Sequence, residues 1–335
     1  MPYYQDDTVT LLLGDAREQL AALPDGSANC IVTSPPYYGL RDYGTPGQYG
    51  LEESPAAYVE TMRAVFAEAR RVLADDGTLW LNLGDSYSAT PPGKSKHAMR
   101  SSRLDGRKAA ATLRESVRSA GVDRSKFLPQ KNLLGIPWRV AFALQDDGWF
   151  LRAEIIWAKR NVMPEAATDR PTRAHEQVFL FTKRSRYFYN ADAIREESTS
   201  TAQEAHNQRY ARQYEAHTER AATTGQPGNV NSAGIHSRPG KGGRNARTVW
   251  TISQTPNRQA HFATFPTELP LRCIKAGCKP NGVVLDPFSG SGTTGAAARQ
   301  LDRRYIGVDL NPEYHELAKG RFAQGAFFFE EGGAA

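Results

Sequence analysis

A glycine-rich loop between an apolar strand and a helix constrains the fold more than any other feature of this chain. Residues 282–286 (Gly-Val-Val-Leu-Asp) have the character of a short buried strand, and residues 296–301 have a helical pattern. Between them, Gly290, Gly292 and Gly295 give the spacing G-x-G-x-x-G. Glycine at these positions lets a backbone turn tightly and approach a nucleotide, so this unit predicts an α/β fold with a nucleotide site at the strand's end.

An acidic residue stands where a site of this kind needs one. About 20 positions beyond the glycine loop, Asp309 follows the apolar run 305–308. A carboxylate at the end of a strand can accept hydrogen bonds from both hydroxyls of a ribose. The glycine spacing also permits an NAD-dependent dehydrogenase, so the spacing by itself leaves that class of enzyme open.

Strand and helix patterns alternate along most of the chain. A helical repeat of apolar residues begins at Pro55 and is predicted to end at Asp75-Asp76-Gly77, and a second helix begins at Pro137. Apolar runs that predict strands occupy residues 8–13, 30–33, 78–83, 151–157 and 177–182. This alternation predicts a mostly parallel sheet with helices on both faces.

The tetrapeptide Ser34-Pro35-Pro36-Tyr37 follows the predicted strand 30–33. Its two prolines fix φ at successive positions and remove two backbone donors, which leaves local carbonyls free to accept hydrogen bonds. The Ser34 hydroxyl and the Pro35 carbonyl can take the two N–H bonds of an exocyclic amine, while the Tyr37 ring stacks on a flat heterocycle. A Pro-Pro turn that only closes a strand is the alternative, since proline pairs are common in loops.

Side by side, the two motifs resemble those of the amino-group DNA methyltransferases that use S-adenosylmethionine. Residues 286–294 look like the cofactor motif of that family, and Ser34-Pro35-Pro36-Tyr37 looks like its catalytic motif. The catalytic motif comes first in this chain, an order that matches the permuted beta class. The resemblance implies a Rossmann-like S-adenosylmethionine-dependent methyltransferase fold with circularly permuted motif order and inserted DNA-recognition segments.

The resemblance also implies which residues contact each ligand. Residues 261–266 look like the segment that, in this class, precedes the cofactor strand and helps to hold the methionine end. The catalytic residues implied are Ser34, Pro35, Pro36 and Tyr37. The contacts implied for the cofactor, S-adenosyl-L-methionine, are Asp15, Phe265, Asp286, Phe288, Gly290, Gly292, Thr293, Thr294 and Asp309.

The residue before Pro-Pro-Tyr indicates which base is methylated. In the family, Ser is usual there for N4-cytosine enzymes and Asp or Asn for N6-adenine enzymes, so Ser34 favours N4-cytosine, and N6-adenine stays the alternative. The resemblance implies a base flipped out of the duplex and direct in-line transfer. Carbon-5 methylation needs a thiolate, commonly from a Pro-Cys pair, whereas Cys30, Cys273 and Cys278 follow Asn, Arg and Gly. A catalytically silent DNA-binding protein on the same fold is a third possibility.

Two intervals lie outside the expected catalytic domain of residues 1–90, 132–190 and 260–325. In the first, 91–131, eleven Lys and Arg between Lys94 and Lys131 stand against three acids, in a chain of net charge +6. Such a segment is typical of an arm that binds DNA phosphates, with a solvated loop as the alternative. The arm is expected to contact DNA through Arg103, Arg107 and Lys108.

The second interval, 191–250, is rich in Asn, Gln, Thr, Gly, Arg and His. Side chains such as Arg209 and Gln213 are those that make bidentate contacts to guanine and adenine edges. The target-recognition region has this place in the beta class, so we assign base reading to this interval. A flexible linker is the alternative.

Composition restricts the partners and the setting. A pI near 9.2 suggests a polyanionic partner, and double-stranded DNA is expected; a cognate restriction endonuclease, as in restriction-modification systems, and the choice between monomer and homodimer stay open. Three cysteines are too few for a disulfide framework, and the sequence has neither a leader nor an apolar run of membrane-spanning length, which predicts a cytoplasmic protein. The scattered His and Cys residues predict no metal site, and His175 is interpreted as structural.

Overall fold

The computed structural model describes residues 1–89, 118–119, 121–162, 165–197, 243–253 and 265–330. The chain divides into two units. The larger consists of Met1–Phe188 and Thr248–Ala335, and the smaller consists of Tyr189–Arg247. The DNA contacts expected at Arg103, Arg107, Lys108, Arg209 and Gln213 lie outside the described residues.

Nine strands of the larger unit, counted over the described residues, pair in the order β1-β2-β11-β10-β3-β5-β8-β7-β9. The strands β2, β11, β10, β3 and β5 run parallel to one another, and β9 runs parallel to β7. The bounds are β1 Tyr4–Gln5, β2 Val9–Leu13, β3 Ala28–Thr33, β5 Leu73–Leu83, β7 Phe150–Lys159, β8 His175–Thr182, β9 Val249–Ile252, β10 Val283–Asp286 and β11 Arg304–Asp309. The predicted α/β, mostly parallel sheet is confirmed.

Antiparallel pairing enters the sheet through β8, which runs against both β5 and β7. The described part of the β7–β8 connection, 160–162 and 165–174, contains no helix, so the chain returns directly beside β7 instead of crossing over a face. β1 is also antiparallel to β2, and a separate two-stranded pair joins β4, Arg41–Asp42, to β6, Arg118–Ser119.

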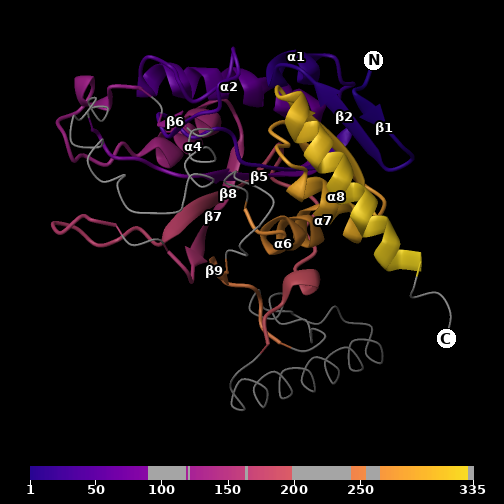
Figure 1. The fold of residues 1–335 in the computed structure, drawn as a ribbon. Helices are drawn as coiled ribbons and strands as arrows, with labels where there is room; N and C mark the ends of the chain where they lie inside the picture. The colour runs from indigo at the N-terminus through magenta and orange to yellow at the C-terminus, as the bar shows by residue number, and fades with distance from the viewer. Residues whose placement is uncertain (90–117, 120, 163–164, 198–242, 254–264, 331–335) are drawn as a thin grey trace, which may run out of the picture. The chain divides into compact units, whose positions relative to one another are not determined.

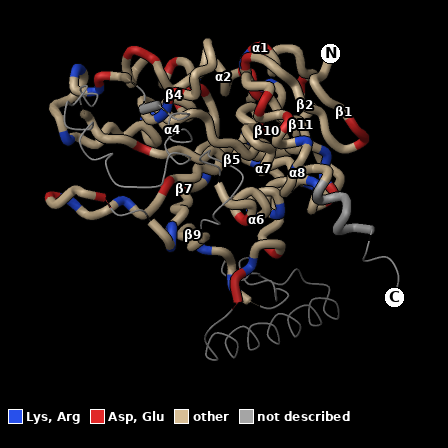
Figure 2. Tube along the Cα trace, in the orientation of Figure 1, with Lys and Arg blue, Asp and Glu red and all other residues tan. Residues whose placement is uncertain are grey.

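Within the part of the chain that the structure describes, three helices lie on each face of the sheet, and Figure 1 shows the two groups. On one face lie α1, Ala16–Ala21, α2, Pro55–Val72, and α4, Ile136–Asp146; on the other lie α6, Glu268–Gly277, α7, Thr293–Gln300, and α8, Pro312–Glu330. Tyr58, Met62 and Phe66 of α2 are fully buried in the core. Figure 2 shows most of the tube, including much of the sheet, in the colour of uncharged residues.

Residues 75–77 belong to a strand, so the prediction that they end the helix from Pro55 was wrong. α2 ends at Val72, and β5 begins at once, because Leu73 pairs with Ala28 of β3 across an irregularity in register. The basic side chains of Lys183 and Arg184 then pair with Asp75 at 3.1 and 2.6 Å. Sheet pairing therefore overrides the turn signal of Asp-Asp-Gly.

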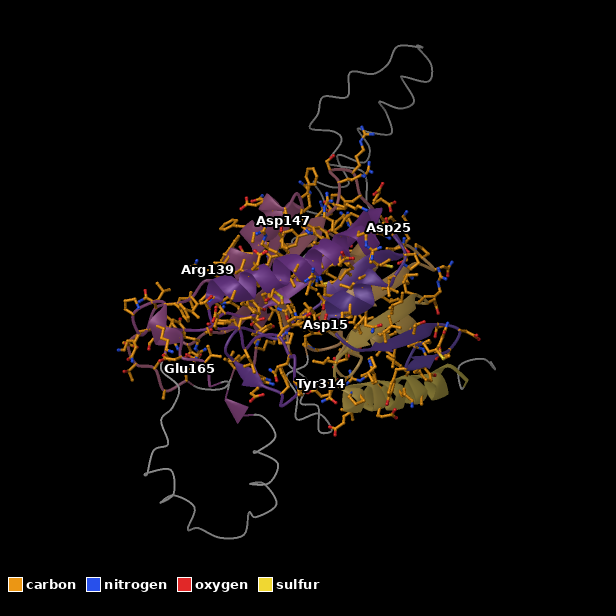
Figure 3. The ribbon with its side chains drawn as sticks, turned by 90° about the horizontal axis from the view of Figure 1, so that it is seen from above. Asp15, Asp25, Arg139, Asp147, Glu165 and Tyr314 are labelled. Atoms are coloured by element: carbon orange, nitrogen blue, oxygen red, sulfur yellow. The ribbon has the colours of Figure 1, made fainter. Side chains whose placement is uncertain are left out.

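Ion pairing joins two helices on the face seen in Figure 3. Arg63 of α2 donates from Nε to Oδ2 of Asp147, just after α4, at 2.8 Å (Asp147 is labelled in Figure 3). The pair is largely exposed, and exposed pairs contribute about 1 kcal/mol or less. The buried apolar stripes of α2 and α4 therefore supply most of the attachment.

The parallel strands carry the functional loops to one edge of the sheet. The carboxyl ends of β2, β3, β10 and β11 meet there, because parallel strands end on the same side. The buried Asp286 at the end of β10 accepts hydrogen bonds from Oγ1 of Thr33 at 2.6 Å and of Thr294 at 2.8 Å. This carboxyl holds the end of β3 and the start of α7 to the glycine loop.

The smaller unit is described only in residues 189–197 and 243–247. It contains a 3₁₀ turn at Asp192–Ile194 and an isolated antiparallel bridge between Glu196 and Arg244. The Glu196 carboxylate pairs with Arg244 at 3.2 Å and with Arg247 at 2.9 Å. These contacts close the two chain segments on each other where interval 191–250 begins and ends, and its base-reading role stays a prediction.

Helices within the described ranges include none long and apolar enough to cross a membrane. Over the same part of the chain, no group of three or more His, Cys, Asp and Glu side chains is placed to hold a metal ion.

Candidate active site

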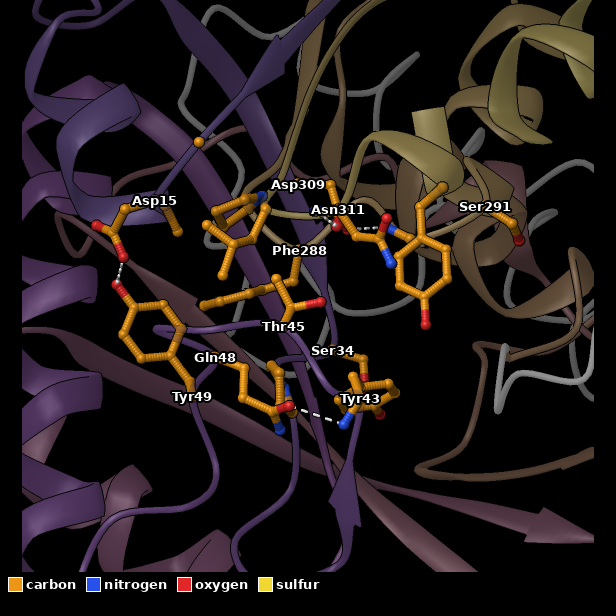
Figure 4. Close-up of a pocket in the computed structure, with 17 residues that line it drawn as sticks. Asp15, Ser34, Tyr43, Thr45, Gln48, Tyr49, Phe288, Ser291, Asp309 and Asn311 are labelled. Atoms are coloured by element: carbon orange, nitrogen blue, oxygen red, sulfur yellow. Dashed lines mark hydrogen bonds between the residues drawn. The ribbon is translucent and has the colours of Figure 1, made fainter. Parts of the chain in front are cut away.

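A pocket opens where the loops after β2, β3, β10 and β11 meet (Figure 4). Each of these loops contributes side chains or backbone to its wall, and the segment 43–49 covers it from another side. We call it the first pocket; its lining residues are Gly14, Asp15, Ala16, Ser34, Pro36, Tyr43, Thr45, Gln48, Tyr49, Pro287, Phe288, Gly290, Ser291, Asp309, Leu310, Asn311 and Tyr314.

Asp309 presents a partly buried carboxylate to the first pocket. Its Oδ2 accepts from the Gly290 N–H at 2.7 Å, and its Oδ1 accepts from the Asn311 N–H at 2.9 Å. These bonds orient the carboxylate and leave a further lone pair on each oxygen. Burial raises the pKa of Asp309 to about 6, so the group is ionised at neutral pH and can accept from two hydroxyl groups of a ligand.

The glycines of the loop serve different purposes. Gly290 has φ +50°, and apart from Gly290 and its two chain neighbours no described residue has an atom within 4 Å of the position that a Cβ would take, so a side chain there would enter open space. Gly292 has φ +74° and precedes α7; a Cβ there would lie 2.8 Å from Cβ of Ala318 and 2.9 Å from Cζ of Phe322. Gly290 therefore keeps space open at the pocket, whereas Gly292 permits α8 to pack on the loop.

Asp15 lines the first pocket while it caps α1. Its Oδ1 accepts from the backbone N–H groups of Arg17 at 2.9 Å and Glu18 at 3.1 Å, and its Oδ2 accepts from the Tyr49 hydroxyl at 2.5 Å. The Tyr49 ring meets Phe288 edge-on, with centroids 5.6 Å apart. Together these residues form a wall that is polar at Asp15 and aromatic beside it (Figure 4).

A second pocket begins on the other side of the Ser-Pro-Pro-Tyr turn. The turn and the segment after it form one wall, and side chains from β5, β7 and β8 form the other. Its lining residues are Ser34, Pro35, Tyr37, Leu40, Arg41, Tyr43, Asn82, Trp157, Lys159, Glu176 and Phe265. Ser34 and Tyr43 line both pockets, so the two spaces meet at the Ser34 side chain.

The turn holds its acceptors in a defined arrangement. The Tyr58 hydroxyl of α2 donates to the Pro36 carbonyl at 2.9 Å and so anchors the turn to the helix. No described residue donates to the Pro35 carbonyl. Ser34 donates its own proton to the Tyr37 hydroxyl at 3.1 Å, which leaves the lone pairs of Ser34 Oγ available as acceptors.

Tyr37 is fixed at both its ring and its hydroxyl. A Cβ at Gly84 would lie 2.3 Å from Cε2 of the ring, so only glycine permits this close approach. The hydroxyl donates to Glu176 Oε2 at 2.7 Å, and Oδ1 of Asn82 lies 3.1 Å from it. Burial, followed by the Glu176 charge, raises the pKa of Tyr37 well above its ordinary value, so the phenol stays neutral.

The predicted site residues separate into three groups. Asp15, Ser34, Pro36, Phe288, Gly290 and Asp309 line the first pocket, and Pro35, Tyr37 and Phe265 line the second. Asp286, Gly292, Thr293 and Thr294 line neither. Asp286 and Thr294 bond to each other beneath the loop, and the Thr293 hydroxyl accepts from Arg321 at 2.6 Å.

Several pocket residues have no counterpart among the sequence predictions. Tyr43, Gln48 and Tyr49 lie in a segment without a motif, and Lys159 and Glu176 are charged residues near strand ends that belong to no motif. Asn82 had a signal, because it is a polar residue inside the apolar run 78–83. A buried polar side chain needs partners, and pairing at a site is one way to supply them.

Comparisons with known proteins agree on one kind of protein. A family model described as DNA methylase matches residues 28–320. Type II methyltransferase M.Cfr9I of Citrobacter freundii is 45% identical over 314 residues, which cover 93% of this chain and 87% of that protein. Type II methyltransferase M.SmaI of Serratia marcescens is 40% identical over 311 residues, which cover 93% of this chain and 89% of that protein.

Solved structures share the fold. PvuII DNA methyltransferase (cytosine-N4-specific) matches with a TM-score of 0.61 at 19% identity, over 96% of this chain and 88% of that chain. A candidate DNA modification methylase from Thermus thermophilus, complexed with S-adenosyl-L-methionine, matches with a TM-score of 0.55 at 24% identity, over 94% of this chain and 93% of that chain.

Proposed function

Because this chain belongs to the N6/N4 family of DNA methylases, we propose that it transfers a methyl group from S-adenosylmethionine to the N4 amine of cytosine in double-stranded DNA. The observation that carries this proposal is the meeting of the two pockets at Ser34. One space suits an adenosine-containing methyl donor, the other suits a flipped base, and the acceptor turn lies between them.

The first pocket fits S-adenosylmethionine by the chemistry of its walls. The oriented Asp309 carboxylate suits two ribose hydroxyls, Phe288 and Leu310 offer apolar surface to an adenine ring, and the unfilled space beside Gly290 suits close approach of a ligand to the loop. When bound, S-adenosylmethionine supplies a methyl group on a sulfonium centre, and the carbon–sulfur bond breaks onto sulfur as the nitrogen–carbon bond forms.

The second pocket suits the target base. Ser34 Oγ and the Pro35 carbonyl can accept the two N–H bonds of the exocyclic amine, which draws the nitrogen lone pair out of conjugation with the ring. That lone pair then points toward the first pocket, and catalysis rests on orientation and on stabilisation of the positive charge that develops on nitrogen. Reaching this pocket requires the base to leave the duplex, which costs a few kcal/mol of stacking and pairing.

Ser34 supports cytosine as the target. It presents a neutral hydroxyl acceptor where the N6-adenine enzymes of the family usually have Asp or Asn. The order of the motifs, with the acceptor turn at 34–37 before the glycine loop at 287–295, supports a permuted, beta-class arrangement. We propose N4-cytosine specificity on the first of these features and beta-class membership on the second.

We also propose separate DNA contacts for the two intervals outside the catalytic domain. Replacing Arg103, Arg107 and Lys108 by Ala should flatten the dependence of log affinity on log salt, by about 0.9 for each lost phosphate contact. Replacing Arg209 or Gln213 by Ala should instead reduce the preference for specific DNA by about 1–3 kcal/mol per lost contact. Salt titrations on specific and scrambled duplexes measure both quantities, and a reversed pattern contradicts the assignment.

The proposed reaction is tested by identifying its product. Unmethylated DNA of mixed sequence is incubated with the protein and methyl-labelled S-adenosylmethionine, digested to nucleosides and analysed by mass. We expect labelled N4-methylcytosine. Labelled N6-methyladenine alone would contradict the cytosine assignment, and absence of any labelled nucleoside would contradict methyl transfer itself.

A further inference from the structure

A chain of hydrogen bonds leads away from the point where the two pockets meet. Ser34 Oγ donates to the Tyr37 hydroxyl at 3.1 Å, and that hydroxyl donates to Glu176 Oε2 at 2.7 Å. Asn82 Nδ2 donates to the same carboxylate oxygen at 3.2 Å. The other carboxylate oxygen, Oε1, accepts from Lys159 Nζ. These hydrogen bonds therefore connect Ser34, a proposed acceptor of the target amine, to the Glu176 carboxylate without a break.

The hydrogen-bond chain ends at an ion pair, Lys159–Glu176, whose removal from water costs free energy. Glu176 and Lys159 are each 16% exposed, on the paired strands β8 and β7. Lys159 also stands over the Trp157 ring, 4.7 Å from its centroid. Removing an ion pair from water costs free energy that the pair itself often fails to recover, so such pairs are weak devices for stability. Both side chains line the second pocket, where they can serve chemistry.

We propose that Glu176 receives the proton that the target amine loses, through the hydroxyls of Ser34 and Tyr37, and that Lys159 is a positioning residue for the Glu176 carboxylate. The proposal rests on the methyl transfer proposed above and adds the destination of the proton. It holds for a cytosine or an adenine amine, because both lose one proton when they gain one methyl group.

The proton transfer balances at every atom. An N–H bond of the methylated nitrogen breaks, and its electron pair stays on nitrogen. The proton bonds to Ser34 Oγ as Ser34's own proton passes to Tyr37 Oη and Tyr37's proton passes to Glu176 Oε2. Both hydroxyls end the step neutral, and the carboxylate has gained one proton. Tyr37 needs no phenolate form, in accord with its strongly raised pKa.

The surroundings hold the acceptor ready. Asn82 donates from one Nδ2 to Glu176 and to the Gln177 carbonyl at 3.1 Å, which fixes the side of the carboxylate that faces Tyr37. The charged and titratable groups that share this pocket are Lys159 from β7 and, from the segment after the turn, Arg41 and Tyr43.

The first test compares single-turnover methyl transfer at saturating S-adenosylmethionine. Glu176→Gln keeps the size of the side chain and an oxygen for Tyr37, but it cannot take up the proton. Tyr37→Phe keeps the ring and removes the link. We expect each to slow transfer by about 100-fold, and the double variant to be no slower than either one. Glu154→Gln, which changes a partly buried glutamate elsewhere on β7, is the matched control and should stay within about twofold.

The second test is the pH profile of the same rate. If the carboxylate receives the proton, the wild-type rate should fall at acid pH, and Glu176→Gln should lack this acid limb. Lys159→Met should move the limb to higher pH, because a carboxylate without the neighbouring ammonium takes up its proton more readily. A merely structural role of the pair would produce no such shift.

A third readout is spectroscopic. Infrared difference spectra recorded during one turnover should show a protonated carboxyl signal that is absent in Glu176→Gln. If wild type transfers methyl groups and Glu176→Gln keeps both the wild-type rate and the acid limb, the relay is overturned and the proposed function stands. Absence of transfer in wild type would instead remove the proposed function.

Discussion

The two pockets are assembled from different parts of the chain. The first depends on backbone and short motifs at the carboxyl ends of parallel strands, with Asp309 and Gly290 nineteen residues apart and joined by a hydrogen bond. The second brings together the turn at Ser34 and a carboxylate at Glu176, which are separated by most of the larger unit's first segment. The antiparallel strands β7 and β8 supply the second pocket with Lys159 and Glu176.

Asp309 in the first pocket and Glu176 in the second also differ in their surroundings. Burial raises the pKa of Asp309 to about 6, and its bonded partners in the structure are backbone N–H groups. Glu176 is bonded to an ammonium, an amide and a phenol. In the proposed function, the oriented Asp309 carboxylate accepts hydrogen bonds from ligand hydroxyls and serves binding, whereas Glu176 is linked through hydroxyls to the target amine and serves chemistry. The first pocket should therefore control affinity for the methyl donor, and the second the rate of transfer.

The largest effect on affinity is expected for Gly290→Val. The new side chain would occupy the open space beside the loop, and S-adenosylmethionine affinity should fall by about 100-fold or more, which is about 2.8 kcal/mol. Calorimetric titration measures this change. Gly290→Ala places a smaller side chain at the same φ of +50° and carries less backbone strain than β-branched valine; its unfolding temperature, measured beside that of Gly290→Val, separates strain from occupation of the pocket. Equal affinity in both variants and wild type would mean that the ligand does not lie beside Gly290.

Asp309→Ala is expected to weaken binding by about 10- to 100-fold, because charge-assisted hydrogen bonds contribute about 1.5–3 kcal/mol. Wild-type affinity should also fall as the pH drops through about 6, where Asp309 becomes protonated and loses acceptor capacity. Burial raises the pKa of Asp286 to about 6 as well, but wild type and Asp309→Ala both contain Asp286. The pH dependence that disappears in Asp309→Ala therefore belongs to Asp309, and identical profiles would contradict its assignment.

The smallest effect on affinity is expected for Gly292→Ala, which should instead lower stability. The added Cβ would meet Ala318 and Phe322 of α8, and overpacking of this kind costs about 1–3 kcal/mol. Thermal unfolding should show a lower Tm, while calorimetry shows S-adenosylmethionine affinity within about threefold of wild type. A loss of affinity as large as that of Gly290→Val, with an unchanged Tm, would remove the distinction between the two glycines.

Sequence patterns anticipated the motif loops of both pockets better than the charged side chains of the second, and the reason is physical. The glycine loop, Asp309 and the turn at 34–37 are local motifs, in which neighbours along the chain are neighbours in space. Lys159 and Glu176 meet only because β7 and β8 pair, and a single charge at a strand end has no local signature. Asp286 shows that a motif can also mislead about a residue's position. It was expected to contact the cofactor, but its buried carboxyl accepts hydrogen bonds from Thr33 and Thr294 and lines neither pocket.

The most direct test of the account is the variant Ser34→Ala, because the two pockets meet at this side chain. Two quantities are measured on the same preparation: the affinity for S-adenosylmethionine by calorimetry, and the single-turnover rate of methyl transfer to DNA. We predict a rate lowered by about 100-fold, comparable to the loss of one oriented hydrogen bond in other active sites, with affinity within about twofold of wild type. An unchanged rate, or a loss of affinity that accounts for the whole loss of rate, would contradict the placement of the target amine at Ser34.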